Sequence, residues 1–512
     1  MISESSPHAK IPARFAQAPW NEHTDLWRQL DEQLPHDHLA REIREAMAHL
    51  DLTPLYQTYG NRGKAPYRPD LMLAIVLFEL RRAQRQPSQW YRDTHESYPL
   101  WWLGFGIRPS RSCWYEFRDR AGAYVDILNA QLLHQAVDKE LTTAERGALD
   151  GSAVAANASR RRLINHERLE SRLEQLEAVR QDDAQGHRVE DVPGWMAHTA
   201  KGRTQQHHRY QQAQEQLVVL QTNNAQRAPS ERRGAEKIVV STGDPEAALG
   251  LDKEHVFRPL YTVQALRDIE SPFILGYNVF AQASDAATLT PMLRRSAHLT
   301  GRPVKDLLVD SGYVTGHDLA DCAAQDVRLY GPWQANDMSA SKARTKSQFS
   351  KDDFEWHPEH DVYQCPAGHP LKRAERERRG RYGGREVVVW RYRAEASTCQ
   401  ACPLRQQCTT SQKSGRSVRR SEHEDLIIAH RAWMESDEAK SVYRLRGQTI
   451  EIVFADIKEH RGLRRFSGHG LVRVCTEYAL EVLLHNLLVL HRFLSQRQNT
   501  EAMHHTTEKL AA

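Results

Sequence analysis

The chain has 512 residues, of which 40% are hydrophobic and 27% charged, and its formal net charge is +4. This composition excludes a disordered or fibrous protein, and the length is sufficient for several domains and at least one large core. No apolar run approaches the length of a membrane helix, and the polar N-terminus lacks the segments of a signal peptide. We therefore expect a cytoplasmic protein with no membrane partner.

The first part of the chain predicts an all-helical domain. After a flexible N-terminus at residues 1–22, apolar residues recur at helical spacing, and a buried helix is expected over Leu71–Arg82. Together these patterns predict a compact helical N-terminal module over residues 23–135.

The following segments alternate between strand and helix patterns. Strands are expected near Leu149, Pro259–Arg267, Phe273–Ala283 and Leu307–Asp310, with a helical hairpin inserted after the first. The order of elements resembles an RNase H-like mixed sheet flanked by helices, so the fold class is mixed α/β. The predicted boundaries are a first core part at 145–333 (hairpin at 163–232), a basic cysteine-rich insertion at 334–425, a second core part at 426–494 and a disordered tail at 495–512.

Three acidic residues follow a pattern typical of metal-dependent phosphoryl transfer. Asp150 and Asp310 each end a short apolar run and are followed by Gly or Ser-Gly, where we expect a strand to turn. Glu451 lies on a strongly patterned helix expected over residues 437–460. Two carboxylates from strand ends and one from a helix suit a pair of divalent metal ions. The alternative is that both aspartates are ordinary turn residues.

The helix adds charged residues to this set. At 100° per residue, Glu451 and Lys458 point in nearly the same direction, at the edge of the apolar stripe that contains Ile450 and Ile457. The alternative is a surface charge pair on an amphipathic helix. The basic run from Lys458 to Arg465 suits a phosphate backbone, so we predict that Arg461, Arg464 and Arg465 contact DNA.

Four of the seven cysteines are clustered in sequence. Cys365, Cys399, Cys402 and Cys408 have a spacing that suits tetrahedral zinc, with His369 as a substitute ligand. An iron–sulfur cluster needs the same thiolates, and unligated thiols are the third interpretation.

These motifs together resemble the DDE transposases of bacterial insertion sequences, in the branch with a Tyr-Arg-Glu-Lys signature and a cysteine-rich insertion. The signature stands here as Tyr443, Arg446, Glu451 and Lys458, and Asp150-Gly-Ser and Asp310-Ser-Gly-Tyr resemble the motifs of the first two acids. The chain departs from the family at Ile450–Ala455, where Val-Glu-Pro-Val-Phe-Gly is common, and at Ala153, where the family has lysine.

The resemblance implies a function and a set of roles. Asp150, Asp310 and Glu451 would hold two Mg²⁺ ions, with Mn²⁺ as a substitute, and Tyr443, Arg446 and Lys458 would contact phosphates of the element end. The reaction would be cleavage of one DNA strand at each end, followed by attack of the freed 3′-hydroxyl on target DNA. The partners would be double-stranded DNA, as terminal repeats and as target, and a second copy of the chain in a synaptic dimer.

Two other interpretations remain open at this point. One is an RNase H-like nuclease without strand transfer. The other is a non-catalytic DNA-binding protein that retains the fold and its zinc module. Because all three acids are present, we favour an active transposase over both, and over a zinc-ribbon regulator, which leaves the acids unexplained.

Overall fold

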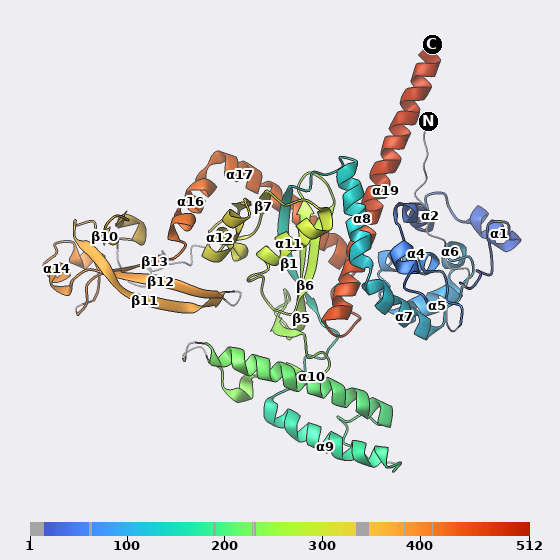
Figure 1. The fold of residues 1–512 in the computed structure, drawn as a ribbon, viewed down its shortest axis with the longest axis horizontal. Coiled ribbons are helices and arrows are strands. Elements are labelled where there is room, and N and C mark those ends of the chain that lie inside the picture. The colour runs from blue at the N-terminus through green and yellow to red at the C-terminus, as the bar shows by residue number, and fades with distance from the viewer. Residues whose placement is uncertain are drawn as a thin grey trace. The chain divides into compact units, whose positions relative to one another are not determined.

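The computed structural model describes residues 15–511, apart from 61–63, 188–190, 228, 230–231, 334–347, 383–384 and 412. Most of the expected flexible N-terminus and the start of the expected cysteine-rich insertion lie outside these residues. The chain divides into two compact units, which we describe separately (Figure 1). The first comprises Met1–Ser284, Met292–Val304 and Gly447–Ala512, and the second comprises Asp285–Pro291 and Lys305–Arg446.

The first unit begins with helices, as the sequence predicts. They are α1 (Asp25–Gln33), α2 (Leu39–Ala46), η1 (Met47–His49), α3 (Thr53–Tyr56), α4 (Pro69–Arg81), α5 (Pro87–Glu96), α6 (Tyr98–Leu103), α7 (Arg111–Gly122) and α8 (Val125–Asp138). α4 is the central helix, because nearly every side chain from Pro69 to Leu80 is buried. Trp90, Trp102 and Trp114 are at most 1% exposed, so these aromatic residues form the core of the module.

The strands of the first unit are antiparallel. β5 (Phe257–Asp268) pairs with β1 (Arg146–Ala155), β4 (Ala248–Leu251) and β6 (Ile274–Phe280). The predicted hairpin is present as α9 (His166–Ala184) and α10 (Ala200–Ala225), which lie side by side (Figure 1). Its ends are joined by a short ladder of β2 (Leu163–Ile164) and β3 (Val240–Ser241), and η3 (Ala235–Lys237) precedes β3. Both helices fall within the range of 163–232 expected for the inserted hairpin.

The C-terminal helices of the first unit differ from the prediction. The expected single helix over 437–460 is divided into α17 (Asp437–Tyr443), α18 (Leu445–Phe454) and a π-helix, η6 (Ala455–His460). The expected disordered tail from Ser495 is instead helical, because α19 runs from Leu471 to Ala511. Residues after Ser495 include neither glycine nor proline, so the sequence contains no residue that ends the helix there.

The second unit combines a small α/β part with a separate sheet. Its first part contains β7 (Asp306–Leu308), η4 (Ser311–Tyr313), α12 (Gly316–Ala324) and β8 (Arg328–Tyr330), and β7 pairs parallel with β8. α11 (Leu289–Thr300) begins in this unit and continues into the first. α16 (Glu424–Glu435) and α17 follow the sheet in sequence.

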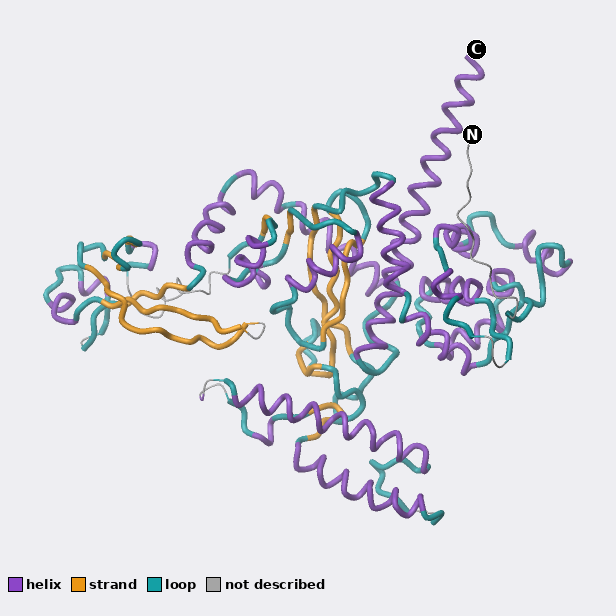
Figure 2. The backbone as a smooth tube through the Cα atoms, viewed as in Figure 1, coloured by secondary structure: helices purple, strands orange, loops and turns teal. Residues whose placement is uncertain are grey.

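The cysteine-bearing sheet has five antiparallel strands. Their order is β13 (Ser417–Ser421), β12 (Arg385–Arg393), β11 (Pro370–Tyr382), β10 (Val362–Gln364) and β9 (Glu355–His357), with η5 (Lys351–Asp353) before it and α14 (Ala396–Gln400) and α15 (Arg405–Cys408) between β12 and β13. Figure 2 shows β11 and β12 as the long antiparallel ribbon of this sheet. The chain is thus a mixed α/β protein, consistent with the expected RNase H-like class. None of the helices in the described residues has the length and apolar character needed to cross a membrane.

Candidate active site

Asp150 lies in the middle of β1, and the expectation that it ends a strand is wrong. The residues after it continue the ladder, with Gly151 opposite Gln264 and Ser152 opposite Val263 on β5. The Gly-Ser pair was interpreted as a turn signal, but both residues are accommodated in an extended strand. Because alternate residues of a strand share a face, Asp150 and Ser152 project from the same side of β1.

The helix that bears Glu451 is attached to that same side. Lys458 donates from Nζ to Ser152 Oγ at 2.9 Å and to the carbonyl oxygen of Ala153 at 3.0 Å. Arg267 on β5, which is opposite Ala148 in the ladder, donates to the carbonyl oxygen of Thr449 at 2.5 Å. Directly opposed residues of an antiparallel pair share a face, so both contacts lie on the face that carries Asp150.

These two contacts bracket Glu451 along the chain. Thr449 precedes it by two residues and Lys458 follows it at the end of the same helical stretch. The apolar side of this stretch is deeply buried, with Ile450, Val453 and Ile457 at most 1% exposed, whereas Glu451 is exposed. Glu451 is thus available to a ligand at the surface. Arg267 and Ser152 hold the helical stretch that bears Glu451 against the sheet, and neither residue was identified from the sequence. Ser152 could have been identified from the sequence, because it lies two residues after Asp150 and therefore on the same face of the strand.

The α-helical geometry from which Glu451 and Lys458 were predicted to point in the same direction is interrupted between the two residues. That prediction assumed 100° per residue, but η6 is a π-helix from Ala455 to His460, so the turn widens between the two residues. Lys458 is half-buried, and burial together with the nearby charge of Lys253 lowers the pKa of its ammonium group. Its position follows from the contacts with β1 rather than from helical periodicity.

Asp310 has a different local structure and belongs to the second unit. It follows β7 and is the N-cap of η4, where its Oδ1 accepts a hydrogen bond from Gly312 N at 2.7 Å. The side chain is half-buried. The predicted turn after the strand is present, and the convergence of Asp310 with Asp150 and Glu451 remains a prediction.

Arg461 is part of the protein interior. Its side chain is 1% exposed, and Nη1 donates to Glu481 Oε2 at 3.1 Å and to the Glu481 carbonyl oxygen at 2.8 Å. It also pairs with Asp456, and Arg85 donates to the other oxygen of Glu481 at 2.8 Å. The predicted DNA contact of Arg461 is therefore wrong, because its guanidinium is buried and paired with two carboxylates of the interior. The sequence of the basic run does not show that Arg461 is buried whereas Arg464 is exposed.

The other residues predicted to contact DNA lie nearer the surface. Arg464 is exposed and pairs with Glu459. Arg465 donates to the carbonyl oxygens of Ala156 and Ala158, at 3.0 and 3.2 Å, just after β1. In the second unit, Tyr443 and Arg446 are half-buried at the end of α17 and the start of α18. Contacts of these four residues with DNA remain predictions.

A basic groove lies along the first unit between the loop after β1, the hairpin and the start of α19. Its arginine side chains are those of Arg161, Arg162, Arg168, Arg172, Arg209 and Arg473. A smaller pocket beside it is lined by Arg160, Arg161, Arg258 and Arg465. Asp244 and Glu246 also line the groove, but both accept hydrogen bonds from the turn before α19. The exposed charge of the groove is therefore mostly positive.

The four clustered cysteines and His369 line one small pocket at the end of the five-stranded sheet. None of the four forms a disulfide. Backbone N–H groups point at two of the sulfurs, from His369 to Cys365 Sγ and from Arg416 to Cys399 Sγ, each at 3.4 Å. Burial raises the pKa of the Cys408 thiol, and the neighbouring cysteines raise it further. The predicted ligands thus line one pocket, but no three of their ligand atoms lie within 4.8 Å of one another, and a metal at this pocket remains a prediction.

Residues 364–491 match a protein-family model described as a transposase DDE domain. The match begins in β10, includes the four cysteines and the Glu451 helix, and ends within α19. It supports a DDE transposase, and it does not extend to Asp150 or Asp310. Searches of curated proteins and of solved structures return no match.

Proposed function

We propose that the protein is the transposase of an insertion sequence, which binds terminal inverted repeats, cuts one strand at each end and joins the freed 3′-hydroxyl to target DNA. The observation that carries the proposal is that the matched segment docks on the strand bearing Asp150, through Lys458 and Ser152. Glu451, on the matched segment, and Asp150, on β1, belong to the same compact unit, which supports the proposal.

The acids have the chemistry and the exposure that the proposed ions require. Carboxylate oxygens are the ligands that Mg²⁺ prefers, and Mn²⁺ accepts the same set. Asp150 is half-buried and Glu451 exposed, so neither is enclosed by apolar side chains. Bound Mg²⁺ would lower the pKa of an attacking water and stabilise the leaving oxygen. We assign Asp150, Asp310 and Glu451 to this role.

Two successive displacements at phosphorus account for the reaction. In the first, a water oxygen forms a bond to phosphorus and the bond to O3′ breaks, which leaves a 3′-hydroxyl at the element end. In the second, that hydroxyl attacks a target phosphate and displaces its O3′. Lys458 supplies a compact positive charge beside the strand that carries Asp150, and Tyr443 and Arg446 supply further contacts with phosphate.

The basic groove is the surface we assign to the element end. Double-stranded DNA carries a dense line of negative charge, and clustered arginines bind it by displacing its counterions. Three of these arginines, Arg168, Arg172 and Arg209, lie on the hairpin helices, so the hairpin contributes directly to the proposed DNA surface. Arg464 and Arg465 extend it toward the end of β1. We further propose a structural Zn²⁺ at the cysteines and a homodimer that holds both element ends.

The test is a cleavage and joining assay with labelled DNA from the flanks of the gene and Mg²⁺, comparing the native chain with Glu451→Gln. Nicks at the element boundary and joined products, both absent with the variant, would support the transposase. Nicks without joining would favour a nuclease. Binding of the ends without either reaction would favour a non-catalytic DNA-binding protein and would overturn the proposal.

A further inference from the structure

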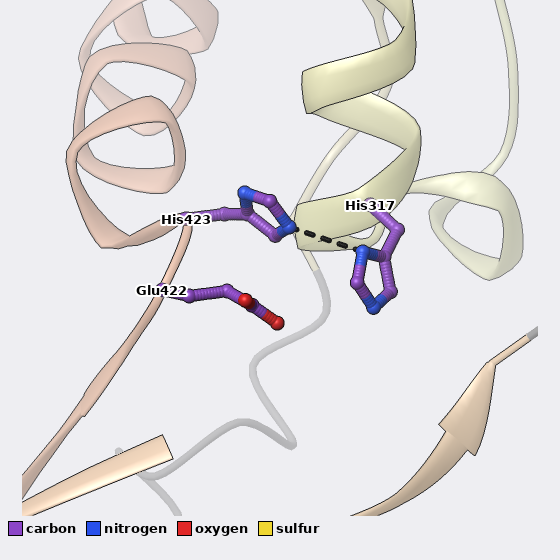
Figure 3. A group of neighbouring side chains, drawn as sticks. All are labelled: His317, Glu422 and His423. Atoms are coloured by element: carbon purple, nitrogen blue, oxygen red, sulfur yellow. Dashed lines mark hydrogen bonds between the residues drawn. The ribbon is translucent and has the colours of Figure 1, made fainter. Parts of the chain in front are cut away.

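A second group of ligand-type side chains lies in the second unit, apart from the acids and the cysteines. This group consists of His317, Glu422 and His423, and each residue places one ligand atom within 4.8 Å of the ligand atoms of the other two. Among the described residues, no other set of three or more His, Cys, Asp or Glu side chains meets this distance criterion. Nε2 of His423 lies 3.0 Å from Nδ1 of His317. Figure 3 shows the Glu422 carboxylate directed toward the space beside the two rings. Two nitrogens and one carboxylate oxygen thus converge from two separate segments.

The surroundings fix the orientation of these ligands. Nε2 of His317 lies 3.1 Å from the carbonyl oxygen of Glu386, which can only accept, so this nitrogen carries the proton and Nδ1 presents its lone pair. Val388 N donates to Glu422 Oε1 at 3.2 Å. Both partners belong to β12. A histidine ligand whose second nitrogen donates to a backbone carbonyl is the usual arrangement around a bound metal, because the contact sets the tautomer and the ring direction.

The backbone also permits the close approach of the two histidines. His317 is 8% exposed and is the second residue of α12, directly after Gly316. A Cβ on Gly316 would lie 3.1 Å from the Cβ of His423, so a larger residue there would require His423 to shift by a few tenths of an ångström. Glycine at this position lets the two rings approach without that shift.

The donor set selects one class of cation. Two imidazoles and one carboxylate suit Zn²⁺ and related transition-metal ions, whereas Mg²⁺ and Ca²⁺ prefer an all-oxygen set. In a tetrahedral zinc site with Zn–N bonds of about 2.0–2.1 Å, two nitrogens stand about 3.3 Å apart. The present separation of 3.0 Å needs to widen by only a few tenths of an ångström. Because Glu422 is exposed, a water can complete the coordination from the solvent side.

The charges around the group are compatible with a cation. Arg385 is the nearby positive side chain, and it is paired with Asp321 through two hydrogen bonds, at 2.7 and 2.9 Å. Asp318 is buried on the same helix, one residue from His317. The two carboxylates on α12 offset the guanidinium, so a divalent ion meets no unbalanced positive charge.

We propose that His317, Glu422 and His423 bind a Zn²⁺ ion that joins α12 to the junction of β13 and α16. α12 begins shortly after Asp310, so the ion would fix the helix that follows the second predicted acid. The site does not depend on the proposed function, because its ligands, its chemistry and its test are separate from strand transfer.

The test measures zinc bound per chain in the full-length protein, for the native chain and for His423→Gln, with His360→Gln as the matched control. His360 is an exposed histidine of the same unit that lies outside the group. We expect His423→Gln to bind one zinc fewer than both others. The difference between variants is the readout, so the result does not depend on whether the cysteines hold zinc.

Two further measurements keep the proposal falsifiable. Glu422→Gln changes an exposed side chain and should leave the fold intact, and we expect it to weaken zinc binding at this site at least about tenfold. Replacement of zinc by Co²⁺ should give a visible absorption that is lost in His423→Gln without a change in any thiolate band. Equal zinc content and equal affinity in all variants would mean that the histidines share only a hydrogen bond, which would overturn the proposal.

Discussion

Two regions of the molecule, each carrying predicted metal ligands, are stabilised in different ways. The region around β1 and the Glu451 helix is built on apolar burial, with Leu149, Ile450 and Val453 at most 1% exposed. The five-stranded sheet with the cysteines has a small core of six buried residues, against which three of the four cysteines pack. We expect the region with the large core to keep its fold without an ion, and the region with the small core to depend on a cross-link, which would be the proposed zinc.

The largest expected effect follows from removing that cross-link. If the cysteines hold the proposed zinc, Cys399→Ser should abolish zinc binding there and unfold the sheet of β9–β13, because structural zinc contributes a large part of the folding free energy of small modules. The measurements are zinc content and the protease sensitivity of residues 348–421, and chelation of the native chain should have the same effect. Cys113→Ser, which changes a half-buried cysteine of α7, is the control. Unchanged zinc content and protease resistance in Cys399→Ser would show that the sheet is stable without metal.

Substitutions of the predicted acids in the region around β1 and the Glu451 helix should have the opposite effect: activity should be lost while the fold is kept. Glu451→Gln and Asp150→Asn should each lower strand cleavage at least about 100-fold, since metal-assisted catalysis supplies several kcal/mol of transition-state stabilisation. Their thermal unfolding should match that of the native chain, because neither carboxylate is buried. Glu459→Gln, an exposed acid on the same helical stretch, should cleave normally. Full activity in Glu451→Gln would mean that another acid serves as the third ligand.

The interior of the first unit allows a test of stability against pH. Burial opposes ionisation of Asp456, but its contacts with His485 and Arg461 outweigh this and lower its pKa from 3.8. A carboxyl group whose pKa is lower in the folded chain stabilises the fold above the unfolded pKa, and this contribution is lost as the pH falls toward the folded value. Asp456→Asn should therefore destabilise the protein by about 3 kcal/mol at pH 7, because the buried Arg461 loses a charged partner.

Denaturant unfolding at several pH values measures this difference. The gap between the native chain and Asp456→Asn should be constant from pH 7 to about 5 and should narrow below pH 3.8, where the unfolded carboxyl becomes protonated. A gap that stays constant down to pH 3 would show that the loss comes from packing and not from charge. Cleavage activity at pH 7 should change little, since Asp456 faces the buried arginine and not the proposed DNA surface.

Much of this comparison could be anticipated from the sequence, because it depends on local patterns. The helical N-terminal module, the hairpin of α9 and α10 and the turn at Asp310 follow from periodicity and from turn residues. The cysteine spacing also predicted residues that the sheet brings to one pocket. Local patterns determine local structure, and these features need no knowledge of distant partners.

Other features depend on contacts between distant segments, which spacing alone does not reveal. Asp150 stays within a strand because β5 continues to pair with Gly151 and Ser152. Arg461 is buried because Glu481 and Asp456 lie beside it, although its neighbour Arg464 in the same basic run is exposed. His317 and His423 meet across 106 positions of sequence, a separation at which no motif links them.

The smallest expected effect concerns the DNA surface, where each charge contributes little alone. Arg209→Ala, on the exposed side of α10, should weaken binding of the element end several-fold and lower the slope of log K against log salt by about 1. Arg180→Ala, on α9 but paired with Glu177 and outside the groove, is the matched control and should leave both quantities unchanged. If Arg209→Ala retains the native slope, the hairpin does not contact phosphate, and the groove would have to serve another ligand. A reduced salt slope together with an unchanged cleavage rate at saturating DNA would show that the hairpin contributes to DNA binding and not to the reaction proposed at β1.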